Sequence, residues 1–160
     1  MELIALFFWI TTAGIGLYLL SIWLIEYDKD FNAVTATRLP PPLLGSHVVM
    51  AFGGLLLWAD YLVFDSAQLA WLAVAAMLTA ATLGTTMAVR WVSVYRASKA
   101  SGTTAKVSLA RPNSRVAVLD RPAREGPSER NFPLPVVVAH GTFATVTIAL
   151  VLMSALGVFG

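Results

Sequence analysis

The sequence predicts an all-α integral membrane protein, a bundle of four transmembrane helices, and three observations predict this class. Hydrophobic residues make up 58% of the 160 residues and charged residues only 12%, whereas soluble domains average about 45–50% and about 25%. Four apolar runs are each long enough to cross a bilayer, which takes about 20 residues. All eight prolines lie outside these runs. This pattern excludes a soluble catalytic domain, because so small a chain cannot bury that much apolar surface.

The predicted spans are residues 3–25, 43–64, 68–89 and 136–159. The first is not a cleaved signal peptide, because Glu2 replaces the basic segment and the apolar run is too long. The second follows three consecutive prolines that end at Pro42, and we expect the third to continue as helix toward Arg96. Few residues around Asp65 separate the second and third spans, which predicts a tight antiparallel hairpin. The chain then divides into a first helical hairpin, residues 1–64, and a second, residues 65–160.

The positions of lysine and arginine predict the orientation of the spans. Lys29 and Arg38 follow the first span, and the other nine basic residues lie between the third and fourth spans. Since basic connections stay in the cytoplasm, both termini are expected outside, in a bacterial inner membrane. The pI of about 9.2 then reflects membrane topology, so no nucleic-acid partner is expected.

The segment 98–131 is the only long polar stretch of the sequence. Its Pro, Gly, Ser and Arg content predicts a mobile basic loop in the cytoplasm, with a small hairpin of residues 107–109 and 116–119 as the alternative. Attraction to anionic lipid is expected in either case.

An internal repeat relates the two halves of the chain. The segment 39–47 aligns without gaps to 132–140, and both segments carry two prolines at the same spacing and end in histidine. Ala51 and Ala144 follow four residues later. The preceding spans correspond through the pairs Gly16 and Gly84, Trp23 and Trp91, and Tyr27 and Tyr95. Because the halves share one orientation, this is a parallel repeat about an axis along the membrane normal.

The repeat places the only two histidines, His47 and His140, at matching depth in the cytoplasmic leaflet, facing each other. An ionisable residue inside a span is expensive in lipid and is by default a functional hypothesis. Neutral imidazole is a good iron ligand, and two opposed imidazoles on adjacent helices form the six-coordinate site of a b-type haem. We therefore predict that both histidines bind one haem b.

Neighbouring residues fit this prediction. Ala51 and Ala144 lie one turn beyond the histidines and are small enough for a porphyrin to lie against the backbone, and Gly54 adds clearance. Arg38 and Arg130 precede the two proline motifs and are candidate ion-pair partners of the haem propionates.

Other roles for the histidines stay open at this point: structural hydrogen bonds between helices, a proton relay, quinone contact or another metal. Two histidines are too few for a zinc or copper site, and the absence of cysteine excludes c-type haem attachment and iron–sulfur clusters. The stripe of Ala76, Ala80 and Gly84 predicts close helix packing, and Gly14 and Gly16 suggest the same for the first span.

With four spans and two matched histidines, the chain resembles in architecture the four-helix transmembrane b-type cytochromes, including cytochrome b561-like proteins and the haem-bearing membrane anchors of respiratory dehydrogenases. Cytochrome b561-type bundles hold two haems on four histidines, so this chain would hold one. The resemblance implies an electron-transfer subunit without substrate chemistry of its own.

Such a subunit would work with membrane redox partner subunits. Quinone binding and homo-oligomer formation stay open. The alternative functions are a cofactor-free membrane scaffold or accessory subunit of a larger complex and, third, a proton- or metal-coupled transporter.

Overall fold

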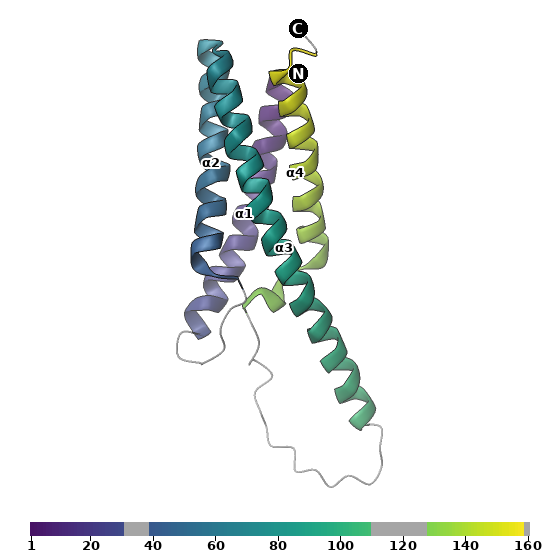
Figure 1. Ribbon diagram of the computed structural model, residues 1–160. Coiled ribbons are helices and arrows are strands. Elements are labelled where there is room, and N and C mark those ends of the chain that lie inside the picture. Colours follow the sequence, from purple (N-terminus) through teal and green to yellow (C-terminus); the bar gives the residue numbers. More distant parts are fainter. Residues whose placement is uncertain (31–38, 110–127, 159–160) are drawn as a thin grey trace.

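The computed structural model describes residues 1–30, 39–109 and 128–158, and these residues form helices and no strand. The helices are α1 (Glu2–Asp30), α2 (Pro41–Phe64), α3 (Ala67–Leu109), the short 3-10 helix η1 (Ser128–Asn131) and α4 (Leu134–Ala155) (Figure 1). Each of α1 to α4 contains a segment long and apolar enough to cross a membrane. The all-helical class with four candidate spans is thus confirmed, and the chain has the make-up of a multi-pass membrane protein.

Local sequence explains where these helices begin and end. Pro40 precedes α2 and Pro133 precedes α4, and proline suits a helix start because it lacks the N–H that a first turn leaves unpaired. Asp65 ends α2 in the left-handed region at φ 48°, and its N–H donates to the carbonyl of Tyr61. Since α3 begins two residues later, the tight turn predicted between the second and third spans is present.

Two helix ends differ from the sequence prediction. The third helix continues past Ser98, where a loop was expected, to Leu109, because no proline interrupts the chain before Pro112. Residues 107–109 are thus helical, in neither the predicted loop nor the alternative hairpin, and the second strand of that hairpin, 116–119, lies outside the described residues. The fourth helix ends at Ala155 instead of residue 159, and Gly157 follows at φ +67°, a conformation that glycine adopts without strain.

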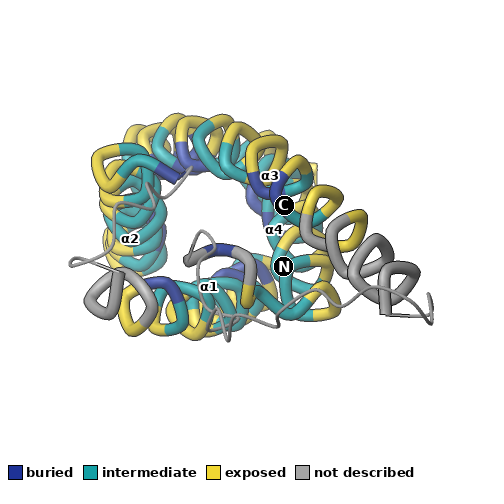
Figure 2. Tube along the Cα trace, turned by 90° about the horizontal axis from the view of Figure 1, so that it is seen from below, coloured by how far each residue is buried: buried dark blue, intermediate teal, exposed yellow. Residues whose placement is uncertain are grey.

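The four long helices surround a common axis, with buried residues turned inward (Figure 2). Within this ring α2 packs chiefly against α3, and α1 chiefly against α4, while the α1–α2 and α3–α4 contacts are sparser. Both ends of the chain lie at one end of the bundle, and α3 extends beyond the other end (Figure 1). The closest packing therefore joins helices from the two halves of the chain, α2 with α3 and α1 with α4.

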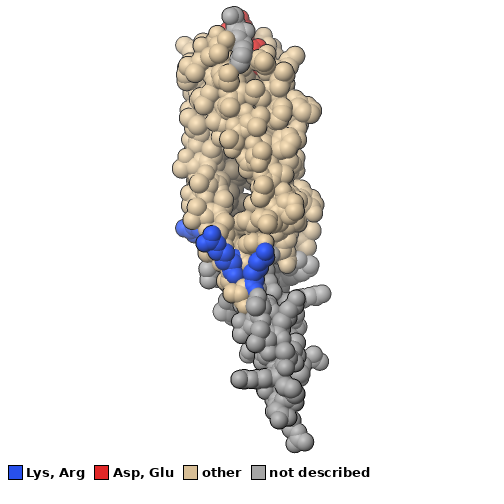
Figure 3. All heavy atoms as spheres, turned by 90° about the vertical axis from the view of Figure 1, so that its right-hand side faces the viewer, with Lys and Arg blue, Asp and Glu red and all other residues tan. Residues whose placement is uncertain are grey.

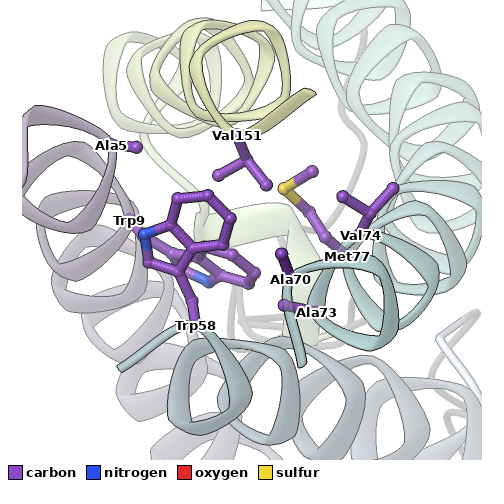
Figure 4. Packing of buried hydrophobic residues seen from close by; sticks show 8 residues of the cluster. All are labelled: Ala5, Trp9, Trp58, Ala70, Ala73, Val74, Met77 and Val151. Atoms are coloured by element: carbon purple, nitrogen blue, oxygen red, sulfur yellow. The ribbon is translucent and has the colours of Figure 1, made fainter. Parts of the chain in front are cut away.

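A hydrophobic cluster fills the bundle toward the end that carries the termini. Its buried members come from all four long helices: Ala5, Trp9, Trp58, Ala70, Ala73, Val74, Met77 and Val151 (Figure 4). Trp58 and Val151, which occupy equivalent positions of the two repeats, are both 0% exposed. Ala5 and Ala73 are a second equivalent pair and are also 0% exposed.

Charged side chains lie at the ends of the bundle. Arg90, Arg96 and Lys99 are exposed on α3, and the described basic side chains gather where this helix leaves the bundle, below an uncharged surface (Figure 3). Glu2 and Asp65 belong to the opposite end, where acidic atoms are visible. The uncharged middle is the surface that a lipid bilayer would cover.

Candidate histidine site

The structure brings the two histidines together on the bundle axis. His47 on α2 and His140 on α4 are half-buried, and the centroids of their rings are 6.4 Å apart with an angle of 69° between the ring planes. Residues 93 positions apart in the chain thus face each other, which is the arrangement that the sequence repeat predicts.

Backbone carbonyls fix the orientation of both rings. His47 Nδ1 lies 2.8 Å from the carbonyl oxygen of Ala80 on α3, and His140 Nδ1 lies 3.1 Å from that of Thr12 on α1. A carbonyl oxygen can only accept, so each Nδ1 carries a proton and donates it. In a neutral imidazole the other nitrogen, Nε2, then keeps its lone pair and is available as a ligand.

Neither Nε2 has a hydrogen-bond partner among the described residues. Ser154 Oγ is the one fully buried side-chain nitrogen or oxygen atom of the described residues that lacks a partner, so neither Nε2 is fully enclosed by protein. Figure 3 shows a hollow in the uncharged surface, above the basic side chains. Among the described residues, no donor therefore uses either Nε2 lone pair.

Two glycines lie directly against the imidazoles. A Cβ placed on Gly84 would be 3.1 Å from His47 Cε1, and one on Gly16 would be 3.0 Å from His140 Cε1. Sequence reasoning assigned these glycines to close helix packing and missed their contact with the histidines. The feature of the sequence that could have indicated this contact is the matched spacing of the two glycines in the repeat. Gly84 lies four residues after Ala80 and Gly16 four residues after Thr12, and these two residues supply the carbonyls that accept from the rings.

The distance between the rings is that of two ligands on one metal ion. A metal lies about 2.0–2.1 Å from an imidazole nitrogen, and the ring centre lies about 1.1 Å behind that nitrogen, so two imidazoles on opposite sides of one metal have centres about 6.2–6.4 Å apart. Among the residues that the structure describes, no group of three or more His, Cys, Asp or Glu side chains could hold a metal ion. Among the described residues, a metal between these rings would thus have two imidazole ligands and no third ligand from a His, Cys, Asp or Glu cluster.

Three small residues were also predicted to make room at the site: Ala51, Ala144 and Gly54. Ala51 and Ala144 are half-buried, one turn beyond the histidines, and Trp9 Nε1 donates to the carbonyl of Ala51 at 3.2 Å. Gly54 is buried, but the indole of Trp9 takes up the space beside it: a Cβ there would lie 2.9 Å from Trp9 Cζ2. The clearance expected at Gly54 is therefore used by a side chain of this protein.

The two arginines predicted to bind propionates cannot be placed against the site. Arg38 lies outside the described residues, and Arg130 belongs to η1, where its side chain is not described. Next to it, Glu129 is 0% exposed, and its carbonyl accepts from Trp91 Nε1 at 3.1 Å. This hydrogen bond attaches η1 to α3 at the end of the bundle where the basic residues gather.

Comparison of the chain with protein-family models, with characterised proteins and with solved structures finds no match. The geometry of the histidine site is therefore the observation that bears on function.

Proposed function

We propose that the protein is a small b-type cytochrome-like membrane subunit that binds one haem between His47 and His140 and relays electrons. The observation that supports this most is the pair of imidazoles at 6.4 Å, each with Nδ1 bonded to a backbone carbonyl. A hydrogen bond from Nδ1 to a carbonyl fixes the tautomer of a metal-binding histidine and makes it a more basic ligand.

The donor set favours haem over a bare metal ion. His47 and His140 would hold the iron, and the porphyrin would supply its remaining ligands. The histidines face each other across the boundary between the α2–α3 pair and the α1–α4 pair, where contacts are sparser than within each pair. A flat group held by both rings would therefore lie between two well-packed helix pairs, without breaking either.

A haem in this place supplies reversible one-electron transfer at its iron. The residues of the chain would hold it: His47 and His140 would bind the iron, and the hydrogen bonds to the carbonyls of Ala80 and Thr12 would keep each proton on Nδ1 and fix the ring directions. Apolar side chains nearby limit water and so tune the reduction potential. One haem alone cannot carry an electron across the whole membrane, so we propose transfer between a cytoplasmic or quinone partner and another membrane subunit.

The proposed setting is the bacterial inner membrane, with both termini outside. The exposed Arg90, Arg96 and Lys99 lie at the end of the bundle opposite the termini, and the positive-inside rule assigns that end to the cytoplasm. Since Gly84 precedes Arg90 by six residues, about 9 Å of helix, the histidine site would lie in the cytoplasmic half of the bilayer.

A reduced-minus-oxidised visible spectrum of the protein in mild detergent tests the proposal. Sharp α and Soret bands are expected, and both should disappear in His47→Ala and in His140→Ala. Ser46→Ala is the matched control, because Ser46 is exposed next to His47 on α2, and it should keep the bands. A folded but colourless protein after haem-supplemented expression would contradict the proposal and favour the cofactor-free scaffold.

A further inference from the structure

We infer that Gly16 and Gly84 are positioning residues that set the angle between the two axial imidazole planes. This inference rests on the proposed haem function and concerns how the chain holds its ligands. It extends the site from two histidines to two units, each made of a histidine, a carbonyl and a glycine.

Each imidazole is constrained along one edge by the helix that it faces. For His47, Nδ1 is bonded to Ala80 O at 2.8 Å, and Cε1 would lie 3.1 Å from a Cβ on Gly84. The hydrogen bond to the carbonyl fixes the position of Nδ1. The backbone at Gly84, one turn further along α3, then limits how far the ring can tilt about this hydrogen bond. A side chain at this position would have to push the ring away from α3.

The second histidine is held in the same way by the other half of the chain. His140 Nδ1 is bonded to Thr12 O at 3.1 Å, and Cε1 would lie 3.0 Å from a Cβ on Gly16. One ring is thus held against α3 and the other against α1, and the two ring planes meet at 69°. The inference assigns this crossed arrangement to the two helix surfaces.

Among the described glycines, only Gly16 and Gly84 would meet a histidine ring, whereas a Cβ at Gly54 would meet Trp9 and Ala76. On α1, a Cβ at Gly14 would meet no atom within 4 Å, and the same holds for Gly45 and Gly53 on α2. A general need for glycine in a membrane helix therefore does not explain the two contacts. Gly14 is exposed and lies two residues from Gly16, which makes it a matched control.

The angle between axial ligands can be measured on ferric haem. Crossed imidazole planes leave the two iron orbitals that overlap with the ligand π systems close in energy, which gives a strongly anisotropic low-spin signal in electron paramagnetic resonance. Parallel planes separate these orbitals and give a more rhombic signal. We expect the wild-type protein to show the strongly anisotropic type.

The experiment compares the purified wild type with Gly16→Ala, Gly84→Ala and Gly14→Ala. Both site variants should keep one haem while their largest g value shifts from that of the wild type and their reduction potential changes. Gly14→Ala should reproduce the wild-type spectrum and potential. In Gly84→Leu, the larger side chain should displace His47 and cause loss of haem, whereas Gly14→Leu should keep it.

Three results would overturn the inference. The first is a site variant with haem and an unchanged spectrum, and the second is a Gly14→Ala shift as large as that of Gly16→Ala. The third is unfolding of both alanine site variants, seen as lost helical circular dichroism, since the glycines would then govern packing and not ligand angle. Failure of the proposed function is distinguishable from all three, because the wild type would itself contain no haem.

Discussion

Replacing Gly54 with alanine tests the packing between α1, α2 and α3. The added Cβ would lie 2.9 and 3.1 Å from Cζ2 and Cη2 of Trp9, and 3.2 Å from the Cβ of Ala76. The indole cannot retreat freely, because its Nε1 is bonded to Ala51 O at 3.2 Å and Trp9 is 4% exposed. The substitution must therefore separate helices or break that hydrogen bond.

The neighbouring glycine provides the control. A Cβ at Gly53 would meet no atom within 4 Å, so Gly53→Ala makes the same change in chain entropy and helix propensity without the clash. Overpacking a core costs about 1–3 kcal/mol, and that is the expected difference between the two variants. At about 2–4 °C per kcal/mol for a chain of 150–250 residues, the midpoint of Gly54→Ala should be about 2–12 °C below that of Gly53→Ala.

Thermal unfolding followed by circular dichroism in one detergent measures this difference. We expect Gly53→Ala to unfold at or above the wild-type midpoint and Gly54→Ala clearly below it. Equal midpoints for the two variants would refute the reasoning, because they would mean that α1 does not approach α2 as closely as the Trp9 contact requires.

Three further results are expected. Thr12 Oγ1 and Thr147 Oγ1 are 3.2 Å apart, and each is also within hydrogen-bond distance of a carbonyl of its own helix. Because the two hydroxyl groups have only two protons for these three contacts, a double-mutant cycle with valine should give a coupling energy of only about 0.6 kcal/mol. A coupling energy of several kcal/mol would contradict this. Trp58→Ala should lower the unfolding free energy by about 3–5 kcal/mol, since Trp58 is fully buried and its Nε1 donates to Glu2 O; an unchanged denaturation midpoint would disprove the packing. The chain has no cysteine, so Asp65→Cys should react with an impermeant maleimide on intact cells and Arg96→Cys only after lysis; the reverse pattern would invert the proposed orientation.

The sequence alone predicts the helical fold well, because it depends on composition and on positions of proline. The four spans and the tight turn at Asp65 follow from these features, and errors are confined to helix ends. The continuation of α3 to Leu109 was not predicted, because the segment is polar and contains Ser and Thr, a composition typical of loops. The absence of proline before Pro112 is the feature that favours helix there. The sequence also does not predict which helices pack most closely. The repeat implies that the two halves are related by symmetry, but it does not determine which helix of one half contacts which helix of the other.

For the site, the repeat alone predicts that His47 and His140 face each other, as the structure has them. The roles of Gly16 and Gly84 could not be predicted, because a glycine in a membrane helix more often marks helix–helix packing than a side-chain contact. The position of Trp9 beside Gly54 also depends on a long-range contact between α1 and α2. Periodicity within one helix carries no information about such a contact.

Near-infrared magnetic circular dichroism of the ferric protein, with haem counted per chain, tests most directly whether the two Nε2 atoms share one iron. The account predicts a low-spin band at the energy of bis-imidazole ligation and one haem per chain. A high-spin spectrum, a band of another axial pair, or one haem for every two chains would contradict it.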